Sequence, residues 1–201
     1  MTNKTLKDRD GNTVSKEIVE ELKSQVRGDL ILPGDAGYEE ARQIWNALID
    51  KHPGAILKCR GTADVATATR FARANNILVS VRGGGHNVGG RAVCDDGLVI
   101  DLSYMRAVHV DPVNKTVRAQ GGALLGDVDR ETNLHGLAVP LGIISATGIG
   151  GLTTGGGFGW LARKYGAACD NVIEAEVVMA DGSVKTTSTN QNTDLFWGCL
   201  L

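Results

Sequence analysis

Glycine is concentrated in one part of this sequence, and that concentration constrains the fold more than any other feature. Nineteen of the 27 glycines lie between Gly83 and Gly166. They gather in five groups, at residues 83–85, 89–90, 121–122, 148–151 and 155–159. Strand-like and helical patterns separate the groups, which argues against low-complexity disorder. Because glycine admits positive φ and lets backbone N–H groups approach a ligand, the groups are either tight turns or ligand contacts.

Length and charge narrow the class of protein. The chain has 201 residues, 42% hydrophobic and 22% charged, which suits one large or two small globular domains. A net charge of −2 gives no basic footprint for nucleic acid. No apolar run reaches the roughly 18 residues of a membrane helix, and the polar N-terminal stretch does not resemble a secretory signal. We therefore expect neither a nucleic-acid partner nor a membrane partner.

The cysteines and histidines form no metal-ligand pattern. No C-x-x-C pair or clustered Cys/His spacing occurs, so we expect no metal site. Four cysteines in a chain of this length are too few for a disulfide scaffold, which favours a reducing, cytoplasmic location. These cysteines are Cys59, Cys94, Cys169 and Cys199.

The apolar periodicity predicts an α+β chain with a β-α-β first half and a mostly antiparallel second half. The expected strands lie at 55–58, 77–81, 98–102, 108–110, 116–119, 174–180 and 183–187. The expected helices cover 38–48, 64–74 and 123–135, with an amphipathic surface helix that includes Ile18 and Leu22. Trp160, Leu161 and Tyr165 are expected to face the core from a further short helix.

The segment Arg82-Gly83-Gly84-Gly85-His86-Asn87 follows directly on an expected strand. Its three successive glycines offer unhindered N–H groups that can form an anion-binding nest, and Arg82 adds positive charge. No Walker A pattern occurs in the chain, so we interpret this loop as a different kind of diphosphate cradle. His86 either bonds the loop backbone or faces the ligand, where its imidazole could act as a nucleophile.

Several segments taken together resemble the berberine-bridge-enzyme-like FAD-linked oxidases, which belong to the vanillyl-alcohol oxidase/p-cresol methylhydroxylase superfamily. They occur in order at 81–87, 140–142, 147–159, 163–166, 170–182 and 194–197. The resemblance implies an α+β, two-subdomain FAD-binding fold of the p-cresol methylhydroxylase type. We expect a polar helical extension at 1–34 and an FAD-binding domain at 35–201. This domain would divide into subdomains at about 50–112 and 113–201.

The resemblance also assigns FAD contacts to two segments. The diphosphate loop comprises Arg82, Gly83, Gly84, Gly85, His86 and Asn87. The second segment, against the isoalloxazine, contains Thr147, Gly148, Gly150, Gly151, Thr154, Gly155, Gly156 and Gly157. The family's covalent histidine falls on His86. Ile144 occupies the place of the cysteine found in doubly tethered members, so His86 is expected to be the only tether.

The implied activity is that of an oxidase. A hydride would pass from a C–H of a small-molecule alcohol, sugar or amine to flavin N5, with dioxygen as the acceptor. The family continues after Asp194-Leu195-Phe196-Trp197 into a substrate domain that these 201 residues do not contain. We therefore expect a chain truncated at its C-terminus that lacks turnover by itself, and we assign no catalytic base.

Two alternatives stay open, together with a consequence of truncation. The chain is alternatively a non-catalytic FAD-binding fragment, or part of a reductase that holds FAD non-covalently, which the presence of His86 disfavours. A flavin face left uncovered, with Ile149 exposed, predicts self-association or incomplete FAD loading.

Overall fold

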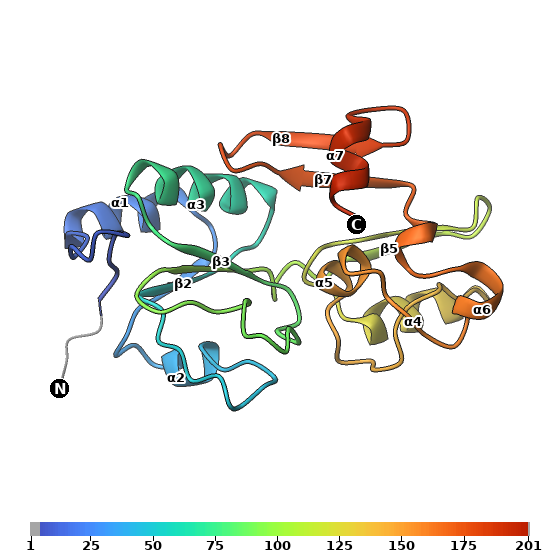
Figure 1. Cartoon of the computed structure of the whole chain (residues 1–201), viewed down its shortest axis with the longest axis horizontal. Coiled ribbons are helices and arrows are strands. Elements are labelled where there is room, and N and C mark those ends of the chain that lie inside the picture. Colours follow the sequence, from blue (N-terminus) through green and yellow to red (C-terminus); the bar gives the residue numbers. More distant parts are fainter. Residues whose placement is uncertain (1–4, 201) are drawn as a thin grey trace. The chain divides into compact units, whose positions relative to one another are not determined.

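The computed structural model of the chain describes residues 5–200, which fall into two units (Figure 1). Unit 1 contains the described residues up to Tyr104 together with Val178–Val184. Unit 2 contains Met105–Val177 and the described residues from Lys185 onward. Within the described part of the chain, no helix is both long enough and apolar enough to cross a membrane.

Unit 1 is built on a four-stranded mixed sheet. Its strands in spatial order are β1 (Asp29–Ile31), β2 (Ala55–Lys58), β4 (Leu98–Asp101) and β3 (Val79–Arg82). The strands β2 and β3 both pair in parallel with β4, whereas β1 is antiparallel to β2. Every residue of β4 is buried, as expected for the central strand of a covered parallel sheet. Because the three parallel strands end at one edge, Lys58, Arg82 and Asp101 emerge there in register.

Helices cover both faces of this sheet (Figure 1). The helices α1 (Lys16–Gln25) and α3 (Thr62–Ala74) lie on one side, and the single turn α2 (Tyr38–Ala41) lies on the other. The hydroxyl of Ser15 accepts the N–H of Ile18 and so caps α1. Small residues such as Ala68 line the buried face of α3, which lets the helix approach the sheet closely.

The N-terminal segment is part of unit 1 and not the separate helical extension expected at 1–34. Residues 1–4 of that expected extension lie outside the described residues. Leu6 is 3% exposed, and Asp8 forms a β-bridge with Ile77. The strand β1 then adds an edge to the sheet. Its three residues are too short to show a strand period in the sequence, which explains why it was not predicted.

Unit 2 combines short strands with short helices. Its elements are β5 (Val108–Asp111), β6 (Thr116–Ala119), α4 (Leu125–Asn133), α5 (Ile149–Thr154), α6 (Ala162–Tyr165), a 3₁₀ turn (Cys169–Asn171), β7 (Glu174–Val178), β8 (Val184–Ser188) and α7 (Thr193–Gly198). The last residue of β7 and the first residue of β8 belong to unit 1. The pairs β5/β6 and β7/β8 each form a two-stranded sheet, and β5/β6 is antiparallel. A core of Leu125, Val128, Leu141 and Ala168 packs beneath β5 and β6.

Three sequence expectations differ from this structure. Along the sequence, unit 1 first gives way to unit 2 between Tyr104 and Met105 and not at 112/113. A boundary at 112/113 would separate β5 from its partner β6. The helix expected at 38–48 ends with α2 at Ala41. Trp160 and Tyr165 do not face the core but are 86% and 51% exposed.

The close approach at Gly54 provides a test of how the N-terminal segment packs. A Cβ at this position would lie 2.3 Å from the Cα of Leu6 and 2.5 Å from the carbonyl oxygen of Asp96. Since both neighbours are backbone atoms, we expect Gly54→Ala to lower the free energy of unfolding by about 2 kcal/mol or more. Urea denaturation measures the change. Gly61→Ala, where a Cβ meets nothing within 4 Å, is the control and should be nearly neutral.

The start of α4 provides a pH-dependent test. Asp127 accepts hydrogen bonds from the Nε of Arg106 and from the N–H of Leu124, each at 2.8 Å, and its other oxygen forms an ion pair with the same guanidinium at 2.5 Å. The Arg106 guanidinium, helped by the N–H of Leu124, holds the pKa of the Asp127 carboxyl below its ordinary value. A depressed folded pKa adds stability that is present above the unfolded pKa and is lost as the pH falls through the folded pKa.

We therefore expect Asp127→Asn to lower the free energy of unfolding by about 0.5–1 kcal/mol at pH 7. The difference from wild type should shrink as the pH falls below about 4, the ordinary pKa of the unfolded carboxyl, and disappear below the lower pKa of the folded one. Denaturant curves at several pH values measure it. Asp129→Asn, on the exposed face of the same helix, removes the same charge without touching the contacts to Arg106 and Leu124 and is the control.

Candidate cofactor-binding site

The glycine loop of unit 1, residues 83–87, begins at the carboxyl end of β3. Gly85 is buried and has φ of 71°, in the left-handed region that favours glycine. Within the described residues, none of the backbone N–H groups from Gly83 to Asn87 donates a hydrogen bond. A run of free amides around a left-handed residue forms a concave anion site. The loop therefore fits the diphosphate of a dinucleotide.

Arg82 does not project its charge into this loop. Its guanidinium donates to the carbonyls of Ala41 and Gln43 and forms an ion pair with Asp101. The Asp101 carboxylate is fully buried and also accepts the N–H and hydroxyl of Ser103, at 3.0 and 3.1 Å. The positive charge expected to face a diphosphate is thus neutralised by Asp101, and Arg82 acts by fixing the end of β3.

His86 follows the free amides and lies against an indole ring. The ring centroids of Trp45 and His86 are 5.4 Å apart, and the ring planes differ by 22°. Neither imidazole nitrogen has a hydrogen-bond partner in the described part of the chain. The structure therefore does not show a loop histidine that bonds the backbone, and both ring nitrogens are available to a ligand.

The glycine-rich segment of unit 2, residues 147–157, surrounds α5. Packing explains some of its glycines. A Cβ at Gly150 would lie 2.9 Å from the Gly121 carbonyl oxygen, and one at Gly157 would lie 2.6 Å from the Cβ of Ala168. At Gly151 and Gly156 a Cβ would meet nothing within 4 Å. The absence of a side chain at Gly151 and Gly156 leaves backbone uncovered, as a flat ring would require.

Some polar groups of the same segment have a hydrogen-bond partner within the chain and others have none. Thr154 donates its hydroxyl to the carbonyl of Gly150 at 3.0 Å, within α5. The N–H groups of Gly150 and Gly151, in the first turn of α5, find no acceptor in the described residues. The Thr153 hydroxyl is buried without a hydrogen-bond partner, and sequence analysis did not single it out.

The remaining predicted residues of the 147–157 segment lie in the backbone around α5. Gly148 precedes the helix and Gly155 follows it. The Thr147 carbonyl accepts the N–H of Leu125 at 2.9 Å. Ile149, which was expected to be exposed, is partly buried because it packs on the core of unit 2. Ile144, at the place of the second tether, is 53% exposed.

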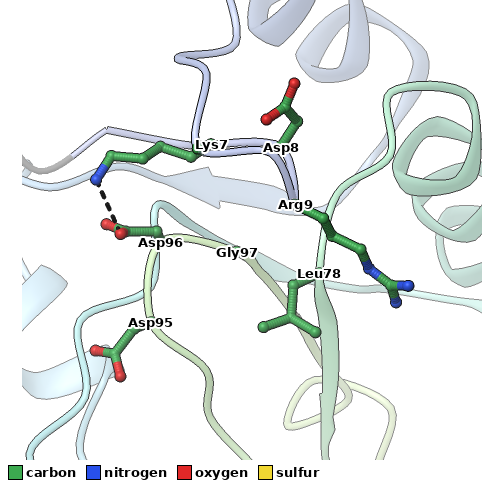
Figure 2. Close-up of a pocket in the computed structure, with 8 residues that line it drawn as sticks. Lys7, Asp8, Arg9, Leu78, Asp95, Asp96 and Gly97 are labelled. Atoms are coloured by element: carbon green, nitrogen blue, oxygen red, sulfur yellow. Dashed lines mark hydrogen bonds and ion pairs between the residues drawn. The ribbon is translucent and has the colours of Figure 1, made fainter.

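A pocket of about 360 Å³ lies where the strands β3 and β4 begin, at the opposite end of these strands from the glycine loop (Figure 2). It is lined by Lys7, Asp8, Arg9, Gly11, Leu78, Asp95, Asp96 and Gly97. Lys7 and Asp96 form an ion pair across it at 2.9 Å, and Asp95 accepts the N–H of His52. Because Lys7 is paired with Asp96 and two more carboxylates, those of Asp8 and Asp95, also line the pocket, the glycine loop is the better candidate for binding an anionic cofactor.

Comparison with known proteins identifies the family. The family described as FAD binding domain matches residues 53–188. The (R)-6-hydroxynicotine oxidase of Paenarthrobacter nicotinovorans is 38% identical over 172 residues, covering 86% of this chain and 38% of the relative. The glucooligosaccharide oxidase of Sarocladium strictum is 36% identical over 164 residues, covering 80% of this chain and 33% of the relative.

Solved structures show the same fold. The 6-hydroxy-D-nicotine oxidase from Arthrobacter nicotinovorans superposes with a TM-score of 0.85 and 37% identity, covering 87% of this chain and 38% of that one. A berberine-bridge-enzyme-like protein of Physcomitrella patens gives a TM-score of 0.85 at 27% identity, covering 90% and 40%. This chain therefore spans about two fifths of the length of these relatives. The TM-scores confirm the expected α+β FAD-binding fold. The chain belongs to the FAD binding domain family of FAD-linked oxidoreductases, and its cofactor is FAD.

Proposed function

We propose that this chain is the FAD-binding portion of an oxidase and that it holds FAD covalently through His86. Its substrate would be a small molecule oxidised at a C–H of an alcohol, sugar or amine. When bound, FAD accepts a hydride at N5 and passes the electrons to dioxygen. The observation that carries the proposal is the 83–87 loop, where free amides adjoin an imidazole with two unengaged nitrogens. The related oxidases of 6-hydroxynicotine and glucooligosaccharides support dioxygen as the acceptor.

The chain's own residues would bind and orient the cofactor. The N–H groups of Gly83 to His86 would donate to the diphosphate, since hydrogen bonds to charged oxygens are stronger than neutral ones. Asn87 would close this loop. In unit 2, the uncovered backbone at Gly151 and Gly156 would lie against the isoalloxazine. The free amides of Gly150 and Gly151 would oppose negative charge on the ring, as the donors of an oxyanion hole do.

His86 would supply the covalent bond. The bond joins a ring nitrogen of His86 to the 8α carbon of the flavin, and it replaces one C–H and one N–H. The two hydrogens and their electrons pass to dioxygen, which leaves as hydrogen peroxide. A glucooligosaccharide oxidase from Acremonium strictum, 32% identical in the matched part, is described with 6-S-cysteinyl, 8α-N1-histidyl FAD. With Ile144 at the place expected for the cysteine, this chain would carry the histidyl bond alone.

Substitution of Gly84 tests the diphosphate cradle. In Gly84→Val, a branched side chain would cover the neighbouring amides, so we expect FAD binding to weaken at least about tenfold, given that hydrogen bonds to charged groups contribute about 1.5–3 kcal/mol. Titration of flavin-free protein with FAD, followed by quenching of flavin fluorescence, measures the affinity. Gly61→Val, placed in open space before α3, is the control. Unchanged affinity in a folded Gly84→Val protein would refute the cradle.

Replacement of His86 tests the covalent bond. We expect wild type to give a flavin-fluorescent band in a denaturing gel, with the flavin on a His86 peptide by mass analysis. His86→Ala should bind FAD but release it on acid precipitation, because only the bond is removed. His109→Ala, an exposed histidine of β5, is the control and should keep the band. Wild-type protein that releases its flavin, or carries it on a cysteine peptide, would favour the non-covalent alternative or another tether.

A further inference from the structure

We propose that Trp45 is a positioning residue, which holds the imidazole of His86 in the orientation needed to attach FAD. The proposal rests on the covalent attachment proposed above. It assigns a role to a residue of the irregular segment after α2, which the sequence did not connect with the glycine loop.

Core packing does not account for the place of Trp45. Its side chain is 68% exposed, so most of the indole contributes nothing to burial of apolar surface. The ring instead lies nearly parallel to the imidazole of His86, at a centroid distance within the range of favourable aromatic pairs. Among the described residues, the stack with His86 is the aromatic contact of this indole.

The two residues beside Trp45 fix its geometry relative to the loop. The N–H of Trp45 donates to the Gly85 carbonyl at 3.2 Å. The Nδ2 of Asn46 donates to the Val88 carbonyl at 2.9 Å. The side chain of Ile44 lies 3.8 Å from where a Cβ of Gly85 would be. These three successive residues contact the loop on both sides of His86, so the backbone that carries the indole is held at a fixed place relative to the loop.

The ion pair of Arg82 and Asp101 supports this segment from the sheet. The Arg82 guanidinium donates to the carbonyls of Ala41 and Gln43, and Gln43 directly precedes Ile44. Arg82 and Asp101 end the strands β3 and β4, from which the glycine loop and the next turn begin. The segment that carries Trp45 and the loop that carries His86 are thus fixed to the same two strand ends.

Stacking is the kind of contact that orients an imidazole without blocking its chemistry. An unrestrained histidine side chain samples several χ1 wells and a broad range of χ2. The indole occupies one face of the ring and disfavours the rotations that would break the stack. The nitrogen lone pair lies in the ring plane, at the edge, and both nitrogens remain unpartnered. Orientation of a reacting group in advance raises the rate of bond formation.

The experiment compares Trp45→Leu, Trp45→Phe and the matched control Leu48→Ala in the 201-residue chain. Leu48 lies in the same segment and is 92% exposed. Without FAD, NMR of the His86 ring protons reports the stack, because the indole ring current shifts them upfield. With saturating FAD, the growth of the flavin-fluorescent band measures the attachment rate. We expect Trp45→Leu to lose the upfield shift and to attach FAD about threefold to tenfold more slowly, the contribution typical of an aromatic pair.

Trp45→Phe should restore part of both signals, and Leu48→Ala should match wild type in both. An unchanged His86 shift in Trp45→Leu would show that the two rings do not stack, and an unchanged rate at saturating FAD would show that the stack does not position His86. A change confined to FAD affinity would place the indole on the cofactor itself and overturn the proposal. A wild-type chain with the upfield shift but no fluorescent band would instead overturn the covalent attachment, and with it any role of the stack in that reaction.

Discussion

The buried ion pair between Arg82 and Asp101 is the interaction on which the candidate site of unit 1 depends. A carboxylate removed from water is unfavourable unless its oxygens are paired and hydrogen-bonded. Asp101 meets this requirement through the Arg82 guanidinium and through the N–H and hydroxyl of Ser103. Arg82 in turn has donors left over for two carbonyls of the segment after α2. One ion pair therefore joins the ends of two strands, the turn after β4 and the segment that covers the glycine loop.

The glycines divide into those that the fold needs and those that it leaves open. Gly85 has a left-handed φ, and Gly150 and Gly157 stand where a Cβ would strike a neighbour. These positions are explained by backbone geometry and packing alone. Gly151 and Gly156 have empty space where a side chain would extend. A ligand that lies against the backbone explains glycine at such positions, although Gly156, with φ of 101°, also satisfies a conformational need.

The elements that could be predicted from the sequence are those with a complete apolar period. The strands β2 and β4 and the helix α3 have it, and they lie within a few residues of the expected ranges. The helix expected at 38–48 fails for a physical reason. Ile44, Trp45 and Leu48 have spacing compatible with one face of a helix, but only Ile44 packs on the core of unit 1, whereas Trp45 stacks on His86 of the glycine loop and Leu48 is exposed. The spacing of apolar residues in the sequence does not distinguish a side chain that packs on a core from one that packs on a loop.

The fine structure of the site could not be predicted from the sequence because it depends on which strands become neighbours. The glycine loop and His86 stand out in the sequence, since they are contiguous. The pairing of Arg82 with Asp101 requires β3 and β4 to run in parallel and in register, which follows only from the sheet order. An aspartate that ends an apolar run is a weak signal that could have been noticed. Trp45 gave no signal, since its partner lies in a distant part of the chain.

The same ion pair determines how the loop can hold an anion. Because the charge of Arg82 is compensated by Asp101, the loop would offer a diphosphate the dipoles of its N–H groups instead of a free cation. Dipoles attract an anion effectively only when they are held in one direction, and a glycine loop is by nature mobile. The contacts from Ile44, Trp45 and Asn46 restrain that mobility, so less ordering remains to be done when a ligand binds. Burial of Asp101 thus gives Arg82 a supporting role: its charge holds in place the amides that would contact the anion.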